Sequence, residues 1–227
     1  MDTSQPTASS NAAPGFLHGD RATTTQPPNY VENQRVYNEF HVNGAKVLYF
    51  EESKALAAYF LKLVGSLDSP KDSFLDLGCR MGYCLPIFGD AYPNSRVLGI
   101  DIVPEFVEAA STVGDAEVGN AHNLPFADDE FDYIFCAQML EHCYDPQKAA
   151  DEIMRVAKCG FLIGIPLEGP ESFEINPSHY TYSDNAISWL RLFEKSEKFR
   201  LFHAIASNEN TYMNFIFLRV MEPTNES

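Results

Sequence analysis

The sequence predicts an α/β protein with a doubly wound, mostly parallel seven-stranded sheet and a C-terminal antiparallel hairpin. From residue 73 onward, short continuous apolar runs alternate with helical candidates. This pattern is typical of a parallel sheet that helices cover on both faces. Near the C-terminus, two strand-like runs, 199–206 and 211–220, are separated by a short polar segment, which favours a hairpin.

The N-terminal part of the chain predicts a tail and then a helix. The first 30 residues are rich in Thr, Ser, Pro, Ala, Asn and Gln, and such segments bury too little apolar surface to offset the entropy lost on ordering. Further on, Leu56, Phe60 and Leu63 recur at helical spacing. The expected organisation is a disordered tail over 1–30, a helical or lid segment over 31–70, a domain over 71–221 and a C-terminal tail over 222–227.

Five strands and their connecting helices are expected in the central part of the chain. The strand candidates are SFLDLG, SRVLGID, AEVGN, FDYIFCA and GFLIGIP. The helix candidates are residues 82–89, 104–112, 146–157 and 185–194. Ser183 and Asp184 are interpreted as the N-cap region of the last helix.

Charge argues against a nucleic-acid substrate. The formal net charge is -16, and no Lys or Arg lies between Arg96 and Lys148, where acidic residues are frequent. Binding of a phosphate backbone depends on Lys and Arg, so DNA and RNA are disfavoured, and most of these acids are interpreted as a solvated face. No apolar stretch is long enough to span a membrane and no signal-like N-terminus is present. These features predict a soluble, cytoplasmic protein without an integral membrane segment.

The cysteine pattern predicts free thiols and no metal site. The five cysteines include no C-x-x-C pair of the kind that zinc and redox sites use. Cys79 and Cys84 are close enough in sequence to form a disulfide, but both fall in the expected ligand-binding region. Buried thiols are therefore the favoured interpretation.

The turn after the first strand, DLGCRMG, is the first candidate ligand site. Ligands of doubly wound sheets bind beyond the carboxyl ends of the strands, and Gly78 and Gly82 allow a tight turn close to a ligand. Asp76 places a carboxylate at the same strand end, where it can hold an ammonium group. A glycine turn can also occur without a ligand, so this signal alone is weak.

The second strand ends in Asp101, about 23 residues after Gly78, which is the place of a ribose-binding acid in nucleotide-binding α/β units. Such an acid can also be a helix N-cap, but together with Asp76 it favours a ligand that contains adenosine. The G-x-G-x-x-G fingerprint is absent because Arg80 and Met81 interrupt it. NAD and FAD are therefore disfavoured, and a cofactor without a pyrophosphate is favoured.

Four ordered motifs carry a family resemblance over residues 73–166. They are FLDLGCRMGY, VLGIDIVPEFVEAA, NAHNLPFADDEFDYIFCAQMLEHCYDP and EIMRVAKCGFLIGIP. In turn they resemble the glycine motif, the ribose-binding strand, the adenine-site and fourth-strand region, and the fifth strand of class I S-adenosylmethionine (SAM)-dependent methyltransferases of the type 11 group. The resemblance implies a Rossmann-like methyltransferase fold with SAM as cofactor.

The resemblance also assigns cofactor-binding residues. They are Asp76, Gly78, Cys79 and Gly82 at the methionine end, Asp101 at the ribose, Ile102, Asn120 and Ala121 at the adenine, and Gln138 and Met139 beside the transferable methyl. Asn120 stands where the family usually has Asp, and its side-chain carbonyl can still accept from the adenine amino group. Arg80 stands where the family commonly has Gly, and we expect this long cation to point away from the tight turn.

Two histidines are candidate catalytic bases. Removal of a proton from a hydroxyl or a protonated amine suits a base of near-neutral pKa, and His142 and His179 follow the fourth and fifth strands. Each has a structural alternative as a residue that orders its loop. Glu141 is interpreted as a loop or helix-end charge, and Tyr37 is the candidate lid aromatic.

The sequence thus predicts a SAM-dependent methyltransferase that acts on an O or N atom, or on a C atom, of a small-molecule, glycan or lipid-like acceptor. A catalytically silent SAM-fold protein that binds or regulates a partner is the alternative. An NAD-linked oxidoreductase is the third hypothesis. The acidic stretch favours neutral or cationic acceptors.

Overall fold

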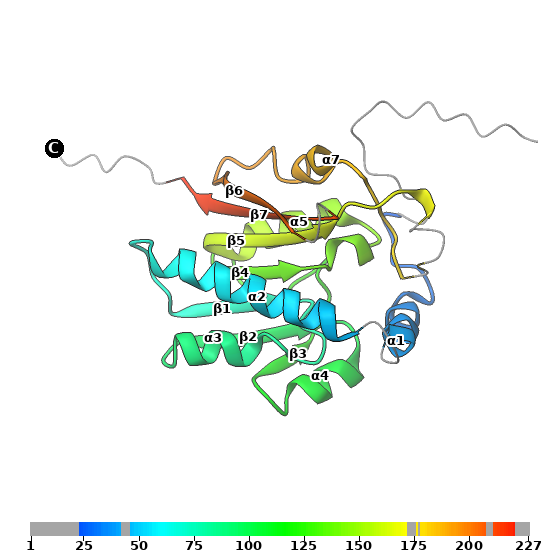
Figure 1. The fold of residues 1–227 in the computed structure, drawn as a ribbon, viewed down its shortest axis with the longest axis horizontal. Helices are drawn as coiled ribbons and strands as arrows, with labels where there is room; N and C mark the ends of the chain where they lie inside the picture. Colours follow the sequence, from blue (N-terminus) through cyan, green and yellow to red (C-terminus); the bar gives the residue numbers. More distant parts are fainter. Residues whose placement is uncertain (1–22, 42–45, 172–175, 177, 208–210, 221–227) are drawn as a thin grey trace, which may run out of the picture.

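Seven strands form one sheet in the computed structural model, which describes residues 23–41, 46–171, 176, 178–207 and 211–220, with the backbone alone over 36–41 and 46–50. The strands are β1 (Ser73–Leu77), β2 (Arg96–Asp101), β3 (Ala116–Val118), β4 (Phe131–Ala137), β5 (Ala157–Pro166), β6 (Phe199–Ser207) and β7 (Tyr212–Arg219). Their order in the sheet is β3-β2-β1-β4-β5-β7-β6 (Figure 1).

The strand directions confirm the predicted fold class. Strands β3, β2, β1, β4 and β5 run parallel, whereas β7 pairs antiparallel with both β5 and β6. The central strands are buried on both faces, as in β4, where every residue before Ala137 is buried. This explains why they read as continuous apolar runs rather than as alternating ones.

Helices cover both faces of the sheet. They are α1 (Tyr30–His41), α2 (Lys46–Gly65), α3 (Leu85–Ala91), α4 (Pro104–Ala110), α5 (Pro146–Val156) and α7 (Ala186–Leu190), with a short 3-10 helix, η1, at Leu140–His142. Figure 1 shows α1 beyond the edge of the sheet at which the parallel strands end. This helix therefore lies where a doubly wound sheet binds its ligands.

Two apolar clusters hold the helices in place. On one face, Phe88 of α3 packs against Phe74 of β1, and Phe60 of α2 packs against Tyr133 of β4. In a second cluster, Ile153 of α5 and Trp189 of α7 pack with apolar residues of the sheet. The sheet is thus covered on both sides, as the alternation of strands and helices predicts.

Several helix boundaries differ from the sequence-based expectation, since α3 covers Leu85–Ala91, α4 ends at Ala110 and α7 ends at Leu190. Helix α5 ends at Val156 because β5 already begins at Ala157. The N-cap of α7 is Asn185, whose side chain accepts a hydrogen bond of 2.9 Å from the backbone N–H of Ile187. The expected N-cap region at Ser183 and its neighbour is therefore wrong by one to two residues.

The cysteines are free thiols, as predicted, and all except Cys159 are buried. Within the described part of the chain, no helix is both long and apolar enough to cross a bilayer. Of the predicted tails 1–30 and 222–227, residues 1–22 and 222–227 lie outside the described residues, as does the side chain of Tyr37. Residues 23–30 are described, and the backbone N–H of Thr23 donates to the carbonyl of Tyr144 at 2.8 Å.

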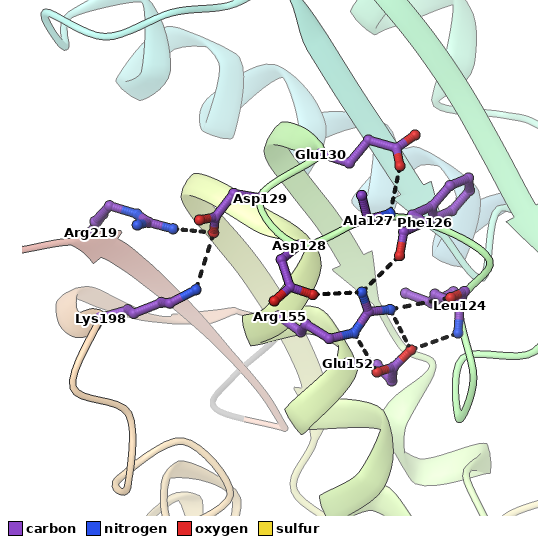
Figure 2. Close-up of polar contacts among 10 residues, drawn as sticks. All are labelled: Leu124, Phe126, Ala127, Asp128, Asp129, Glu130, Glu152, Arg155, Lys198 and Arg219. Carbon is purple, nitrogen blue, oxygen red and sulfur yellow. Dashed lines mark hydrogen bonds and ion pairs between the residues drawn. The ribbon is translucent and has the colours of Figure 1, made fainter.

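Part of the acidic stretch is paired with bases from outside it, whereas Glu105, Glu108, Asp115 and Glu117 are exposed, as the solvated-face interpretation expects. Figure 2 shows Arg155 of α5 donating to Glu152 from Nε and Nη2, at 2.7 and 2.8 Å, and to Asp128 at 3.0 Å. The same guanidinium donates to the carbonyls of Phe126 and Leu124. It thereby fixes the loop that leads into β4.

Two further acids of this stretch tie strands together. Asp129 binds Lys198 at 3.3 Å and also contacts Arg219 of β7 (Figure 2). Asp132 of β4 is buried and accepts from the backbone N–H groups of Asp72 and Ser73 at 2.7 and 3.1 Å. These acids join β4 to the start of β1 and to the C-terminal hairpin.

Arg155→Met keeps the aliphatic stem of the side chain but removes its hydrogen bonds. We expect the free energy of unfolding to fall by about 2 to 3 kcal/mol, because Glu152 loses its cationic partner and two carbonyls lose a donor. Urea unfolding followed by circular dichroism measures the change. Lys195→Met, at an exposed lysine, is the control. Equal losses in both variants would contradict a specific role for Arg155.

Candidate functional site

Two adjoining cavities open at the carboxyl ends of the parallel strands. Cavity one is lined by Tyr30, Gln34, Leu77, Gly78, Arg80, Ile100, Asp101, Ile102, Val103, Phe106, Gly119, Asn120, Ala121, Gln138, Met139 and His142. Cavity two is lined by Ser53, Asp76, Gly78, Cys79, Arg80, Tyr83, Cys84, Phe135, Ala137, Gln138, Glu141, His142, Pro166, Glu168, Asn176, His179 and Tyr212. The residues that line both are Gly78, Arg80, Gln138 and His142.

The turn after β1 separates the two cavities. Gly78 has φ +80, and a Cβ there would lie 2.6 Å from Cγ of Met139, so only glycine fits. Gly82 has φ +75 and allows close approach of Ala110 in α4. Gly82 lines neither cavity, and its contribution is to the shape of the turn.

Asp101 fastens this turn to the end of β2. Its two carboxylate oxygens accept from the backbone N–H groups of Arg80 and Val103, each at 2.9 Å. Burial raises the pKa of Asp101, and these two hydrogen bonds oppose the rise. The carboxylate also lines cavity one, where its remaining lone pairs can accept from a ligand.

Asp76 is a buried carboxyl in the wall of cavity two. Burial raises its pKa to about 7, and the nearby Asp101 charge adds to the rise. A cationic ligand group in cavity two would stabilise the ionised form. Asp76 therefore suits an ammonium ligand, as the sequence predicts.

Asn120 has a role in the structure that the sequence does not predict. Its side-chain carbonyl accepts from both the backbone N–H and Nδ1 of His122, at 2.9 and 2.7 Å. Its amide nitrogen donates to Gln26 at 3.2 Å. Both lone pairs of the carbonyl are thus engaged within the loop, and an adenine amino group could bind there only if the loop rearranged.

Helix α1 closes cavity one through Tyr30, which sequence reasoning did not single out as the key aromatic. Its hydroxyl donates to the backbone carbonyl of His142 at 3.0 Å, and its ring packs edge-to-face against Tyr144 and Tyr180. Gln34 of the same helix donates to the carbonyl of Ser178 at 3.1 Å. Both residues line cavity one. Tyr30 falls within the stretch 1–30 that the sequence predicts to be a disordered tail, and Gln34 falls within the predicted lid segment 31–70.

The two candidate bases lie side by side in cavity two. The rings of His142 and His179 are 4.6 Å apart and nearly perpendicular. Glu141 of η1 lies beside them and is 1% exposed, so this predicted loop or helix-end charge is a buried carboxyl. Burial raises the pKa of Glu141 well above its usual range, and the Arg80 charge opposes part of that rise.

Arg80 does not point away from the site as expected. It is half-buried, lines both cavities, and its charge acts on Asp101 and Glu141. Its backbone has φ 50, a conformation that glycine adopts without strain. The remaining assigned residues Ile102, Ala121 and Met139 line cavity one, Cys79 lines cavity two, and Gln138 lines both.

Comparison with known proteins identifies relatives of this chain. Residues 75–163 match the model of a family described as a methyltransferase domain. The chain is 29% identical over 131 residues to malonyl-[acyl-carrier protein] O-methyltransferase 1 of Coxiella burnetii, covering 58% of this chain and 45% of that protein. It is 31% identical over 117 residues to norajmaline N-methyltransferase of Rauvolfia serpentina, covering 46% and 40%. The match thus spans less than half the length of these relatives.

Among solved structures, magnesium protoporphyrin IX methyltransferase from Synechocystis PCC 6803 with bound SAH has the same fold. The TM-score is 0.61 at 11% identity, over 85% of this chain and 97% of that chain. At this identity the likeness shows that the two proteins share a fold, whereas the family match rests on the sequence of residues 75–163. Both the predicted fold and the predicted family resemblance are confirmed.

Proposed function

We propose that this protein is an enzyme that methylates an O or N atom of an organic acceptor. Its residues 75–163 match the methyltransferase-domain family, and its fold is that of class I SAM-dependent methyltransferases. The observation that carries the proposal is the Asp101 carboxylate, fixed by Arg80 and Val103 at the wall of cavity one. A buried acid at this strand end suits the two hydroxyls of a ribose.

The two cavities suit the two ends of the cofactor. Cavity one would take the adenosine, with Asp101 on the ribose and Ile102 against the adenine. Asp76 would hold the ammonium of the methionine end in cavity two. SAM supplies a methyl group that its sulfonium already activates for transfer.

The remaining task of the chain is to align an acceptor with that methyl. Gln138 lines both cavities, and its backbone N–H donates to the carbonyl of Gly164 at 2.7 Å. Its backbone is in the left-handed region, with φ 55. A residue held in this conformation marks a position that the surrounding structure fixes. Alignment of two reactants can supply on the order of 7 to 11 kcal/mol of the acceleration.

The acceptor would enter cavity two. Its wall combines the apolar Phe135 and Ala137 with the polar cluster around Glu141, which suits an organic molecule that carries one or two polar groups. The named relatives include an O-methyltransferase and an N-methyltransferase, in line with an O or N acceptor. His142 and His179 would act on the acceptor together with Glu141, rather than either one as a single base.

Calorimetric titration with SAM separates this enzyme from a catalytically silent protein of the same fold. The proposal requires saturable SAM binding, followed by formation of S-adenosylhomocysteine (SAH) with some member of an acceptor library of phenols, carboxylates and amines. Folded protein that binds no SAM at millimolar concentration would exclude the enzyme.

Asp101→Asn tests the ribose contact while keeping the shape of the side chain. We expect SAM affinity to fall about 10- to 100-fold, because the carboxamide is uncharged and has one acceptor oxygen where the carboxylate has two. Calorimetry measures the dissociation constant, and Asp90→Asn, at an exposed acid, is the control. Affinities within twofold of each other for the two variants would contradict the assignment.

The raised pKa of Asp76 predicts that SAM binding depends on pH. The ammonium binds the ionised carboxylate, which is lost as the pH falls through about 7. Affinity should therefore be roughly eightfold lower at pH 6 than at pH 7.5. Asp76→Asn should bind more weakly at pH 7.5 and lose this dependence. Burial also raises the pKa of Glu168 to about 7. If the pH dependence of SAM affinity persists in Asp76→Asn but disappears in Glu168→Gln, the titrating group is Glu168 and not Asp76.

Arg80→Gly replaces a charged residue whose backbone lies in the left-handed region. Glycine adopts φ 50 without the cost of about 1 to 2 kcal/mol that a side chain incurs, and the change removes a positive charge near the expected sulfonium. We expect SAM affinity to stay unchanged or to rise, and the melting temperature to rise. A large loss of SAM affinity would show that the guanidinium takes part in binding.

A further inference from the structure

One group of metal-ligating side chains lies in the wall of cavity two. Glu141 and His142 come from η1, and His179 comes from the segment after β5. One donor atom from each of the three lies within 4.8 Å of the other two. A tetrahedral ion with bonds of about 2.0 to 2.1 Å holds its ligands about 3.4 Å apart, so only small side-chain movements separate this group from a coordinating one.

Glu141 is the unexplained member of the group. The residue is 1% exposed, and its Oε2 is buried without a hydrogen-bond partner. Its Oε1 is 3.9 Å from Nε2 of His142. An unpartnered buried carboxylate oxygen is costly, and a cation between these side chains would remove that cost.

Both histidines are held as metal-ligating histidines are. Nδ1 of His142 donates to the carbonyl and the hydroxyl of Ser178, at 3.2 and 3.1 Å, which leaves the lone pair on Nε2, toward Glu141. Nδ1 of His179 contacts the carboxylate of Glu168. Histidines that bind metals usually donate their second N–H to a backbone carbonyl or a carboxylate, which fixes the ring and its tautomer.

We propose that Glu141, His142 and His179 bind a divalent cation of the zinc, cobalt or iron(II) class in cavity two. Two imidazoles and one carboxylate form a donor set that binds such ions in preference to magnesium and calcium. The latter two ions prefer oxygen ligands. Three protein ligands leave a coordination position toward the cavity, as in catalytic metal sites.

Two neighbouring groups compete with the ion. Nε2 of His179 accepts from the side-chain amide of Asn176 at 2.8 Å, and this amide must turn aside for the nitrogen to bind a metal. The Arg80 charge, which acts on Glu141, opposes a second cation. Removal of either group should strengthen metal binding, which a site formed by chance on the surface would not show.

The role of the ion rests on the proposed function. An acceptor hydroxyl would take the open coordination position and lose its proton to water, because a bound cation lowers the pKa of the hydroxyl. Its oxygen would then form the O–C bond as the S–C bond of SAM breaks, leaving SAH. The site thus favours a hydroxyl acceptor over an amine.

Cobalt(II) titration of chelator-treated, tag-free protein tests the site directly. Visible d–d absorption should report one Co²⁺ per chain, displaced by Zn²⁺. Glu141→Gln should weaken binding at least about 100-fold and Glu168→Gln about 10-fold or more, whereas Arg80→Met should strengthen it. His203→Gln, at an exposed histidine, is the matched control. Circular dichroism verifies that each variant is folded.

Several outcomes would overturn the site. They are the absence of d–d bands, equal binding by the wild type and Glu141→Gln, loss in His203→Gln, or an intense thiolate charge-transfer band from cysteine ligands. SAH titration distinguishes this result from failure of the proposed function. Binding of SAH without Co²⁺ removes only the metal site, whereas Co²⁺ binding without SAH or SAM binding removes the methyltransferase and keeps the metal site.

Discussion

A single carboxylate joins the two strands that frame the site. Asp101 at the end of β2 accepts from the turn after β1 through Arg80 and from the start of α4 through Val103. These bonds fix the position of the glycine turn, and that turn separates cavity one from cavity two. Because the carboxylate is buried, each hydrogen bond it accepts contributes more than it would in water. The division of the site into two cavities depends on this contact.

Electrostatics gives the two cavities different chemistry. The Asp101 charge adds to burial in raising the pKa of Asp76, and a cationic ligand would favour the ionised form of Asp76. Cavity two adds Glu141, Glu168 and two histidines to its wall. The acids that face the cavities are thus placed to meet a ligand, as the proposed function requires, whereas Asp129 and its neighbours before β4 hold the fold through bases from α5 and β7.

The sequence predicts most of the fold because buried parallel strands leave a local signature of continuous apolar runs. It predicts Asp76 and Asp101 because their spacing follows from strand and turn lengths. It does not predict the roles of Tyr30 or Glu141, because those arise from contacts across long stretches of chain: η1 meets α1 and the segment after β5 only in the folded protein. It does not predict the direction of Arg80, whose left-handed backbone places the side chain at the cavities.

The location of the cofactor is the central claim, and a crystal structure of the protein soaked with SAH tests it most directly. The account predicts adenosine in cavity one, ribose hydroxyls on the Asp101 carboxylate and the amino group on Asp76. Density for SAH in any other place, with cavity one closed to it by Tyr30 and the loop around Asn120, would contradict the account.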